Sequence, residues 1–168
     1  MRVVELEQVG PEVWSAVLAG EENVWGPGED LAWVPKQRHV GVLDDDNVPL
    51  ALAGAVIVRV AVGGEQFPVA GVGSVIVTRS MRGRGLARLV IEEILRVCAE
   101  LGPDRAMLFC REELTGLYGR FGFREIEASV SAEQPGGRIT MPMRAMWAPL
   151  IEGAGWPAGA VAVQGEPF

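Results

Sequence analysis

A strand-like run and a helix-like run meet at the sequence RGRGLA, residues Arg82–Ala87. Residues 71–78 before it are mostly apolar, and the apolar positions from Leu86 to Leu101 recur with the period of a helix. A glycine-rich turn between a strand and a helix directs several backbone N–H groups at one point, where the helix dipole favours negative charge. Gly83 and Gly85 allow a close approach of the backbone, and two arginines flank it. The stretch therefore predicts a pyrophosphate-binding loop.

Other phosphate-binding loops have different patterns. The sequence lacks the Gly-Lys-Ser/Thr ending of nucleoside triphosphatases and the Gly-x-Gly-x-x-Gly of dinucleotide-binding folds. Instead, Arg82-x-x-Gly85-x-Ala87 resembles the coenzyme A loop of the GNAT acyltransferase superfamily, Gln/Arg-x-x-Gly-x-Gly/Ala. A second stretch, LYGRFGF at residues 117–123, resembles the family's Leu/Phe-Tyr-x-x-x-Gly-Phe. The two motifs stand in the family's order and cover residues 69–124, and the strand pattern extends the resemblance over most of the chain.

The resemblance implies an α/β (α+β) fold with a central mixed, mostly antiparallel sheet of about seven strands flanked by helices. In this fold the fourth and fifth strands splay apart. Local patterns predict strands at residues 2–6, 39–43, 49–60, 67–78, 106–110, 123–132 and 138–144, and helices at residues 11–20, 86–101 and 112–120. We expect one domain over residues 1–168, in which residues 146–168 form a C-terminal extension packed on the body.

Composition limits the classes of protein that the chain can represent. With 49% hydrophobic and 22% charged residues, the chain is typical of a globular protein. The net charge of −7 argues against nucleic-acid binding through a basic surface and favours attraction of a cationic substrate. The N-terminus lacks the layout of a signal peptide, and the longest apolar run, Leu50–Val58, is too short to span a bilayer. We therefore expect a cytoplasmic protein without a membrane partner.

No metal site is predicted. Cys98 and Cys110 are too few for a disulfide framework or a zinc cluster. The acidic run Asp44–Asp46 lacks the alternation and terminal glutamate of a calcium loop, so it is interpreted as a hairpin turn.

The resemblance implies acetyl-CoA as co-substrate, held by the fourth strand, the loop and one residue after the fifth strand. Backbone groups of the fourth strand would pair with the pantetheine arm, and an N–H near Ile76 would polarise the thioester carbonyl. Tyr118, the only tyrosine, matches the family's proton donor to the leaving sulfur. Arg111 stands where the family often has asparagine. The cofactor-binding residues implied are Val75, Ile76, Val77, Arg82, Gly83, Arg84, Gly85, Leu86, Ala87 and Arg111.

The general base is left open by the sequence. Many family members have a glutamate on the fourth strand, and Gly73 aligns there. A water chain is one alternative, and the remaining candidates are Glu29, Asp30, His39, Glu112, Glu113 and the terminal carboxylate of Phe168. The Phe168 carboxylate is the one we expect to bind or deprotonate the acceptor amine; the alternative is a tail that only covers the core.

Residues 21–37 are expected to contribute to the acceptor pocket, because the family places substrate-binding elements there. Trp25, Glu29, Asp30 and Trp33 are the residues predicted to line it, although the two tryptophans would equally serve to cap the core.

Among the subfamilies, the layout most resembles aminoglycoside 2′-N-acetyltransferases. The prediction is an N-acetyltransferase that moves an acetyl group from acetyl-CoA to the primary amine of a small, cationic, aminoglycoside-like molecule by direct attack. Two alternatives remain, a protein N-terminal or lysine acetyltransferase and a catalytically silent acyl-CoA-binding module. A homodimer is also left open.

Overall fold

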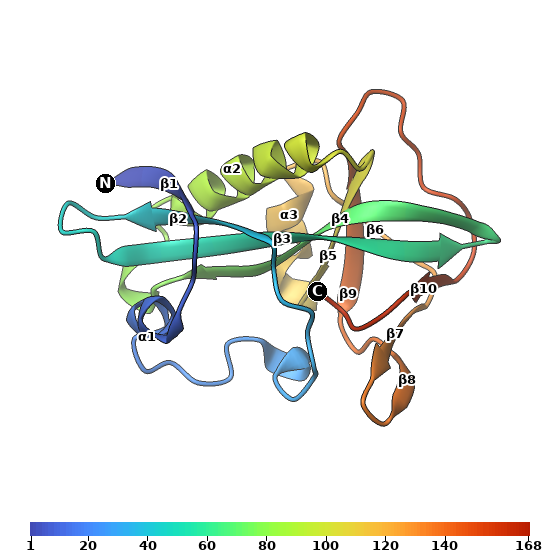
Figure 1. Cartoon of the computed structure of the whole chain (residues 1–168), viewed down its shortest axis with the longest axis horizontal. Coiled ribbons are helices and arrows are strands. Elements are labelled where there is room, and N and C mark those ends of the chain that lie inside the picture. The colour runs from blue at the N-terminus through green and yellow to red at the C-terminus, as the bar shows by residue number, and fades with distance from the viewer.

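In the computed structural model, which describes all of residues 1–168, ten strands form one sheet with helices on both faces (Figure 1). The strands are β1 (Arg2–Leu6), β2 (Arg38–Leu43), β3 (Pro49–Val62), β4 (Glu65–Val77), β5 (Arg105–Cys110), β6 (Arg124–Glu125), β7 (Val130–Gln134), β8 (Gly137–Thr140), β9 (Arg144–Pro149) and β10 (Val161–Val163). The helices are α1 (Pro11–Leu18), α2 (Leu86–Leu101) and α3 (Thr115–Gly119). Short 3-10 turns occupy residues 26–28, 79–81 and 112–114.

The hairpin of β3 and β4 is the centre of the sheet. The strands run in the order β6-β9-β5-β4-β3-β10-β7-β8, and β2 and β1 add to β3 beside this path. The first half of β3 pairs with β2 and its last residues pair with β10, so one long strand joins two parts of the sheet. All pairs are antiparallel except β4 with β5 and β10 with β7.

Alternation along β3 assigns its two faces to different helices. Ala51 and Ala53 belong to the core cluster under α2, whereas Leu52 packs with residues of α1. Because the alanines on the first face are small, the backbone of α2 can approach the sheet closely. The helix α2 spans the residues predicted for it and is capped by Gly102. Figure 1 accordingly shows α2 and α1 on opposite sides of the sheet.

β4 and β5 separate after a short contact. They pair in parallel only from Ala70 to Val72 of β4, opposite Ala106 to Leu108 of β5. Beyond this point β4 follows β3 and β5 follows β9. A bulge accompanies the separation: Gly54 pairs with Gly73 but Leu52 pairs with Ile76, which leaves one extra residue on β4. The predicted splay of these two strands is confirmed.

The region after Arg111 differs from the local predictions. The helix expected at 112–120 is a 3-10 turn followed by the short α3. The strand expected at 123–132 is divided, because β6 pairs with β9 whereas β7 pairs with β8 and β10. These extra short strands raise the number of strands above the expected seven.

The strand expected at 138–144 is divided as well. β8 ends before Pro142, which has no N–H to donate to a ladder, and β9 begins after it. Residues 146–149, expected to begin a C-terminal extension, are therefore part of β9, the strand between β5 and β6.

The remaining tail is built into the sheet. Trp156 packs against Phe67 with ring centroids 5.5 Å apart, and β10 then pairs with both β3 and β7. The Val34 N–H donates to the carbonyl of Pro167 at 2.8 Å. Phe168 is buried against Phe109, with ring centroids 5.1 Å apart. The end of the chain thus lies inside the fold beside the β4–β5 gap.

Gly71 on β4 leaves the space that the Phe168 ring fills. A Cβ at Gly71 would lie 2.4 Å from Cδ2 of that ring, so we expect Gly71→Ala to lower the free energy of unfolding by about 1–3 kcal/mol. Urea denaturation measures the loss. Gly116→Ala is the control, because Gly116 is exposed in α3 with open space around it. Equal stabilities of the two variants would contradict the packing.

Candidate active site

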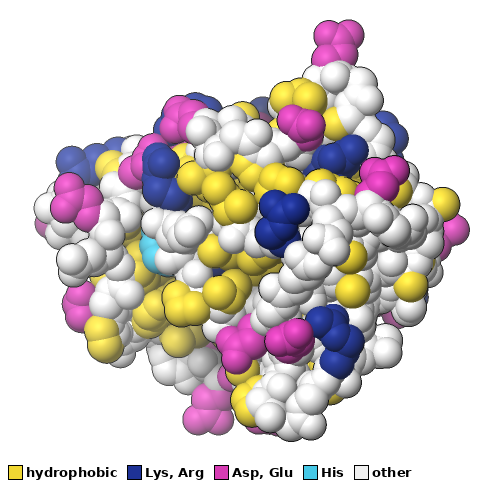
Figure 2. All heavy atoms as spheres, turned by 45° about the vertical axis from the view of Figure 1, so that its right-hand side comes forward, with side chains coloured by type: hydrophobic (Ala, Val, Ile, Leu, Met, Phe, Trp, Pro, Cys, Tyr) yellow, Lys and Arg dark blue, Asp and Glu magenta, His cyan; other side chains and the backbone are white.

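The largest cavity follows the gap between β4 and β5. It has a volume of about 1130 Å³, and its lining comes from α1, the segment after it, β4, the start of α2, β5, α3 and the last residue. Most lining side chains are hydrophobic, but five are cationic and one is acidic. The charged residues are Lys36, Arg82, Arg88, Arg111, Arg120 and Glu92. Figure 2 shows hydrophobic side chains gathered on one face with Lys and Arg side chains beside them.

The predicted pyrophosphate loop forms one end of this cavity. Gly83 and Gly85 have φ values of +77° and +84°, a conformation that favours glycine, and nothing lies within 4 Å of a Cβ at either position. Gly85 is the N-cap of α2, so the free N–H groups of the first turn face the loop. Leu86 and Ala87 also line the cavity, whereas Arg84 does not. The backbone, rather than a side chain of Arg84, is thus what the loop presents.

Arg82 is held by other groups of the chain. Its guanidinium donates to both carboxylate oxygens of Glu21, at 3.0 and 2.5 Å, and to the carbonyl of Val77 at 3.1 Å. The pKa of Glu21 is lowered by its hydrogen bonds with Arg82. Arg82 therefore fastens the loop to the segment after α1 and lines the cavity in that fixed position.

The edge of β4 forms the wall of the cavity. Val75, Ile76 and Val77 line it. Because β4 pairs with β5 only as far as Val72, the following residues have a strand partner on the β3 side alone. An extended ligand could pair with the free side.

Tyr118 projects from α3 into the cavity. The side chain is buried, packs edge-on against Phe123 at 6.0 Å and lines the cavity. Burial raises its pKa, with a smaller contribution from Cys110, so the hydroxyl stays protonated at neutral pH. This is the form that a proton donor requires.

Cys110 lies at the end of β5 and also lines the cavity. Burial raises the pKa of its thiol to about 11, with smaller contributions from Glu125 and Glu113. The thiol is thus protonated near neutral pH and is a poor nucleophile. Its Sγ lies 3.8 Å from the sulfur of Met146.

The predicted acceptor residues separate into two groups. Trp25 and Trp33 line the cavity; Glu29 and Asp30 do not. Trp33 is fixed by a hydrogen bond from Nε1 to the carbonyl of Gly28 at 2.9 Å and by an edge contact with Phe109. Glu29 instead accepts the N–H of Trp25 at 3.1 Å. The tryptophans are therefore cavity walls.

Among the candidate bases, only the Phe168 end lines the cavity. Glu112 pairs with Arg144 at 2.7 Å, and Glu113 pairs with Arg111 at 3.4 Å. His39, half-buried on β2, has its pKa lowered by burial and by the charge of Lys36. Gly73 provides no carboxylate on β4.

Lys36 is a cavity residue that the sequence analysis missed. It is half-buried, and Nζ donates to the carbonyl of Val34 at 3.1 Å. Burial lowers its pKa to about 8. Its only signal in the sequence is that it is the single lysine of the chain, within the segment expected to contact the acceptor.

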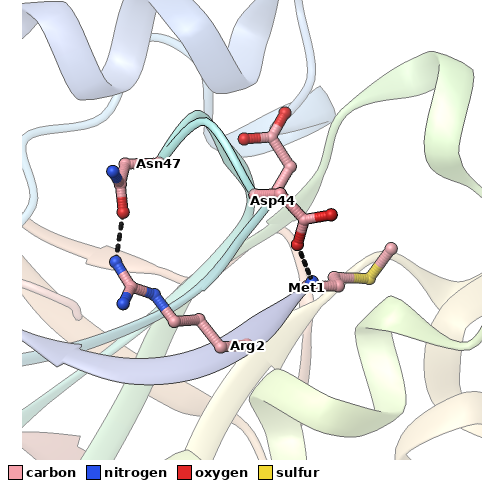
Figure 3. Close-up of a pocket in the computed structure, with 5 residues that line it drawn as sticks. Met1, Arg2, Asp44 and Asn47 are labelled. Carbon is pink, nitrogen blue, oxygen red and sulfur yellow. Dashed lines mark hydrogen bonds and ion pairs between the residues drawn. The ribbon is translucent and has the colours of Figure 1, made fainter.

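A second cavity lies at the turn between β2 and β3 and is polar and exposed (Figure 3). The amino group of Met1 donates to Asp45 at 2.6 Å, and Arg2 donates to Asn47. The carboxylate of Asp44 accepts the N–H groups of Asp46 and Val48 at 2.9 and 2.8 Å. The acidic run thus stabilises a hairpin turn, as its sequence predicted.

Comparisons with known proteins agree with this arrangement. A family model described as an acetyltransferase (GNAT) domain matches residues 13–126, so the chain belongs to the GNAT acetyltransferase family. The structure of the GNAT family N-acetyltransferase YhbS from Escherichia coli, in complex with CoA, has a TM-score of 0.60 at 21% identity over 97% of this chain and 90% of that one. This likeness confirms the predicted fold class.

Two relatives are similar in sequence. N-acetyltransferase Eis of Mycobacterium bovis is 36% identical over 120 residues, which is 67% of this chain and 29% of that protein. Glucosamine 6-phosphate N-acetyltransferase 1 of Oryza sativa subsp. japonica is 36% identical over 98 residues, 58% of this chain and 59% of that protein. The chain thus spans less than two thirds of either relative.

None of its helices combines the length and the apolar character needed to cross a membrane.

Proposed function

We propose that this protein is an N-acetyltransferase that transfers the acetyl group of acetyl-CoA to a primary amine of a small molecule. The observation behind this proposal is that one cavity brings together the free edge of β4, the glycine loop at the start of α2 and the hydroxyl-bearing Tyr118. Both relatives described above are named N-acetyltransferases, which supports the same activity.

The residues of the cavity fit coenzyme A. Nothing lies within 4 Å of a Cβ built on Gly83 or Gly85, so the loop at the start of α2 has room for a pyrophosphate. The free edge from Val75 to Val77 suits an extended pantetheine arm, with an N–H near Ile76 to polarise a carbonyl. When bound, acetyl-CoA would supply the acetyl group as an activated thioester. Arg84 and Arg111 remain proposed contacts at the rim.

Tyr118 is the proposed general acid. Its hydroxyl is protonated near neutral pH because burial raises its pKa, and it would give that proton to the departing sulfur. No nucleophile of the protein is needed, since the amine attacks directly. Burial raises the pKa of the Cys110 thiol and makes it a poor nucleophile, which agrees with direct attack by the amine.

The proposed acceptor is a small cationic amine of aminoglycoside-like chemistry. The net charge of −7 supports attraction of such a molecule from a distance. Within the cavity, the only acidic side chain is Glu92 on α2, so the terminal carboxylate of Phe168 is the group proposed to hold an ammonium near Trp25 and Trp33.

Gly73 in place of a β4 glutamate favours one competing function, an acyl-CoA-binding module without catalysis. Release of CoA during incubation with a panel of amines decides between the two.

The first prediction from the proposed function concerns binding of acetyl-CoA. The ligand should raise the melting temperature of the protein by mass action, and Gly85→Glu should abolish the increase by placing bulk and negative charge in the loop. Gly102→Glu is the matched control, because Gly102 also has positive φ with open space but caps the opposite end of α2. Normal acetyl-CoA affinity in Gly85→Glu would remove the basis of the proposal.

The second prediction concerns Tyr118. Tyr118→Phe keeps the ring and its contact with Phe123 but deletes the proton donor, so kcat should fall roughly 10²–10⁴-fold. The affinity for acetyl-CoA, measured by thermal shift, should stay near that of the unmodified protein. Unchanged turnover would make Tyr118 a packing residue.

The third prediction concerns Phe168. Deleting Pro167 and Phe168 should remove acceptor turnover while acetyl-CoA binding remains. Because the deletion also removes a buried ring, a second variant adds one glycine after Phe168, which keeps the ring and displaces the carboxylate. Normal acetylation of the best amine by this extended variant would show that the carboxylate has no part in the chemistry.

A further inference from the structure

The stem of Lys36 lies across two glycines that face each other on β3 and β4. Gly54 pairs with Gly73 in the sheet. A Cβ on Gly54 would lie 2.6 Å from Cγ of Lys36, and a Cβ on Gly73 would lie 2.7 Å from Cε. Any other residue at either position would therefore displace the lysine, and the glycine pair acts as a slot for its stem.

This slot ends at the cavity. Nζ of Lys36 lies 3.3 Å from the position that a Cβ on Gly73 would take, and the carboxyl carbon of Phe168 lies 3.1 Å from the same point. The amine of Lys36 and the carboxyl end of Phe168 therefore both lie beside Gly73, at the wall of the cavity.

No acidic side chain pairs with the ammonium form of Lys36, and the carboxyl end of Phe168 is the acidic group that lies beside it. Every ion pair of the chain is formed by an arginine or by the N-terminus. Its one hydrogen bond within the chain is the one that Nζ donates to the carbonyl of Val34. A neutral amine can make that bond as well and keeps its lone pair free.

We propose that Lys36 is the general base of the acetyl transfer, a role that rests on the proposed function. Nζ takes one proton from the ammonium of the acceptor and passes it to solvent. The freed lone pair of the acceptor nitrogen forms the new N–C bond as the C–S bond breaks. Tyr118 gives its proton to the departing sulfur and is restored by the second proton that the acceptor nitrogen loses.

A lysine in this environment is suited to the task. A general base works best when its pKa is close to the working pH, and burial lowers the pKa of Lys36 to about 8. Two other titratable groups face it, His39 of β2 and the carboxyl end of Phe168. A charged His39 lowers the pKa of Lys36, as burial does, whereas a carboxylate at residue 168 raises it. A free carboxylate is a weaker base, so its proposed part is to hold the acceptor.

Kinetics as a function of pH test the role of Lys36. The active form of Lys36 is the one with a neutral amine. For the best acceptor of a panel, kcat/KM should therefore rise roughly tenfold per pH unit below about pH 8 and level off above it. The panel comprises an aminoglycoside, glucosamine and a lysine-containing peptide. In Lys36→Met the methionine side chain can lie in the same slot but cannot accept a proton. We therefore expect kcat to fall roughly 10²–10⁴-fold and the rise of kcat/KM with pH to disappear.

Two further variants separate a base from a mere positive charge. Lys36→Arg keeps the charge but cannot release its proton, so we expect it to be as impaired as Lys36→Met. Arg59→Met removes a charge from an exposed position of β3 outside the cavity and should leave turnover unchanged. Normal turnover in Lys36→Arg or Lys36→Met would overturn the proposal.

A second readout needs no acceptor. Because the chain has one lysine, a protein labelled with ¹³C-lysine gives one Cε signal, and its NMR titration reports Nζ directly. We expect a midpoint well below the ordinary lysine value of about 10.4, because burial lowers the pKa of Lys36. A midpoint at the ordinary value would overturn the proposal. Failure of the whole protein to bind acetyl-CoA or release CoA would instead overturn the proposed function.

Discussion

The early end of the β4–β5 pairing is the constraint around which the molecule is arranged. Backbone groups buried without partners are costly, so a sheet does not open between two central strands without compensation. Here β4 stays paired with β3 and β5 stays paired with β9, and the bulge on β4 turns the end of that strand away from β5. The opening becomes the cavity, and α2, α3 and the segment after α1 supply its rim.

Glycines on the central hairpin shape the surface that two distant segments occupy. Gly71 leaves room for the Phe168 ring, and the pair of Gly54 and Gly73 leaves room for Lys36. Each glycine forgoes side-chain packing within the sheet, which weakens a strand on its own. The contacts with residues far away in sequence offset this loss. The sheet and its two covering segments are thus complementary, and each determines where the other lies.

The sequence predicted the features that depend on local pattern. The loop at Gly83 and Gly85 and the helix after it have strong periodicity and clear boundaries, and the structure reproduces both. The region from 123 to 144 did not follow its pattern, because strands of two to five residues are defined by their partners rather than by alternation. Lys36 was missed for a related reason: the register that sets Gly54 opposite Gly73 includes a bulge that no local pattern reveals.

The position of β10 has a consequence for how the fold is reached. This strand lies between β3 and β7 and is their only link in the sheet, yet it is the last strand in the chain. The β7–β8 hairpin can form early, but it has no edge to join until residues 161–163 have added to β3. Because pairings so distant in sequence are slow to form, the closing of this half of the sheet is a late event in folding. The wall of the cavity near Phe168, which follows β10 in the chain, is completed at the same late step.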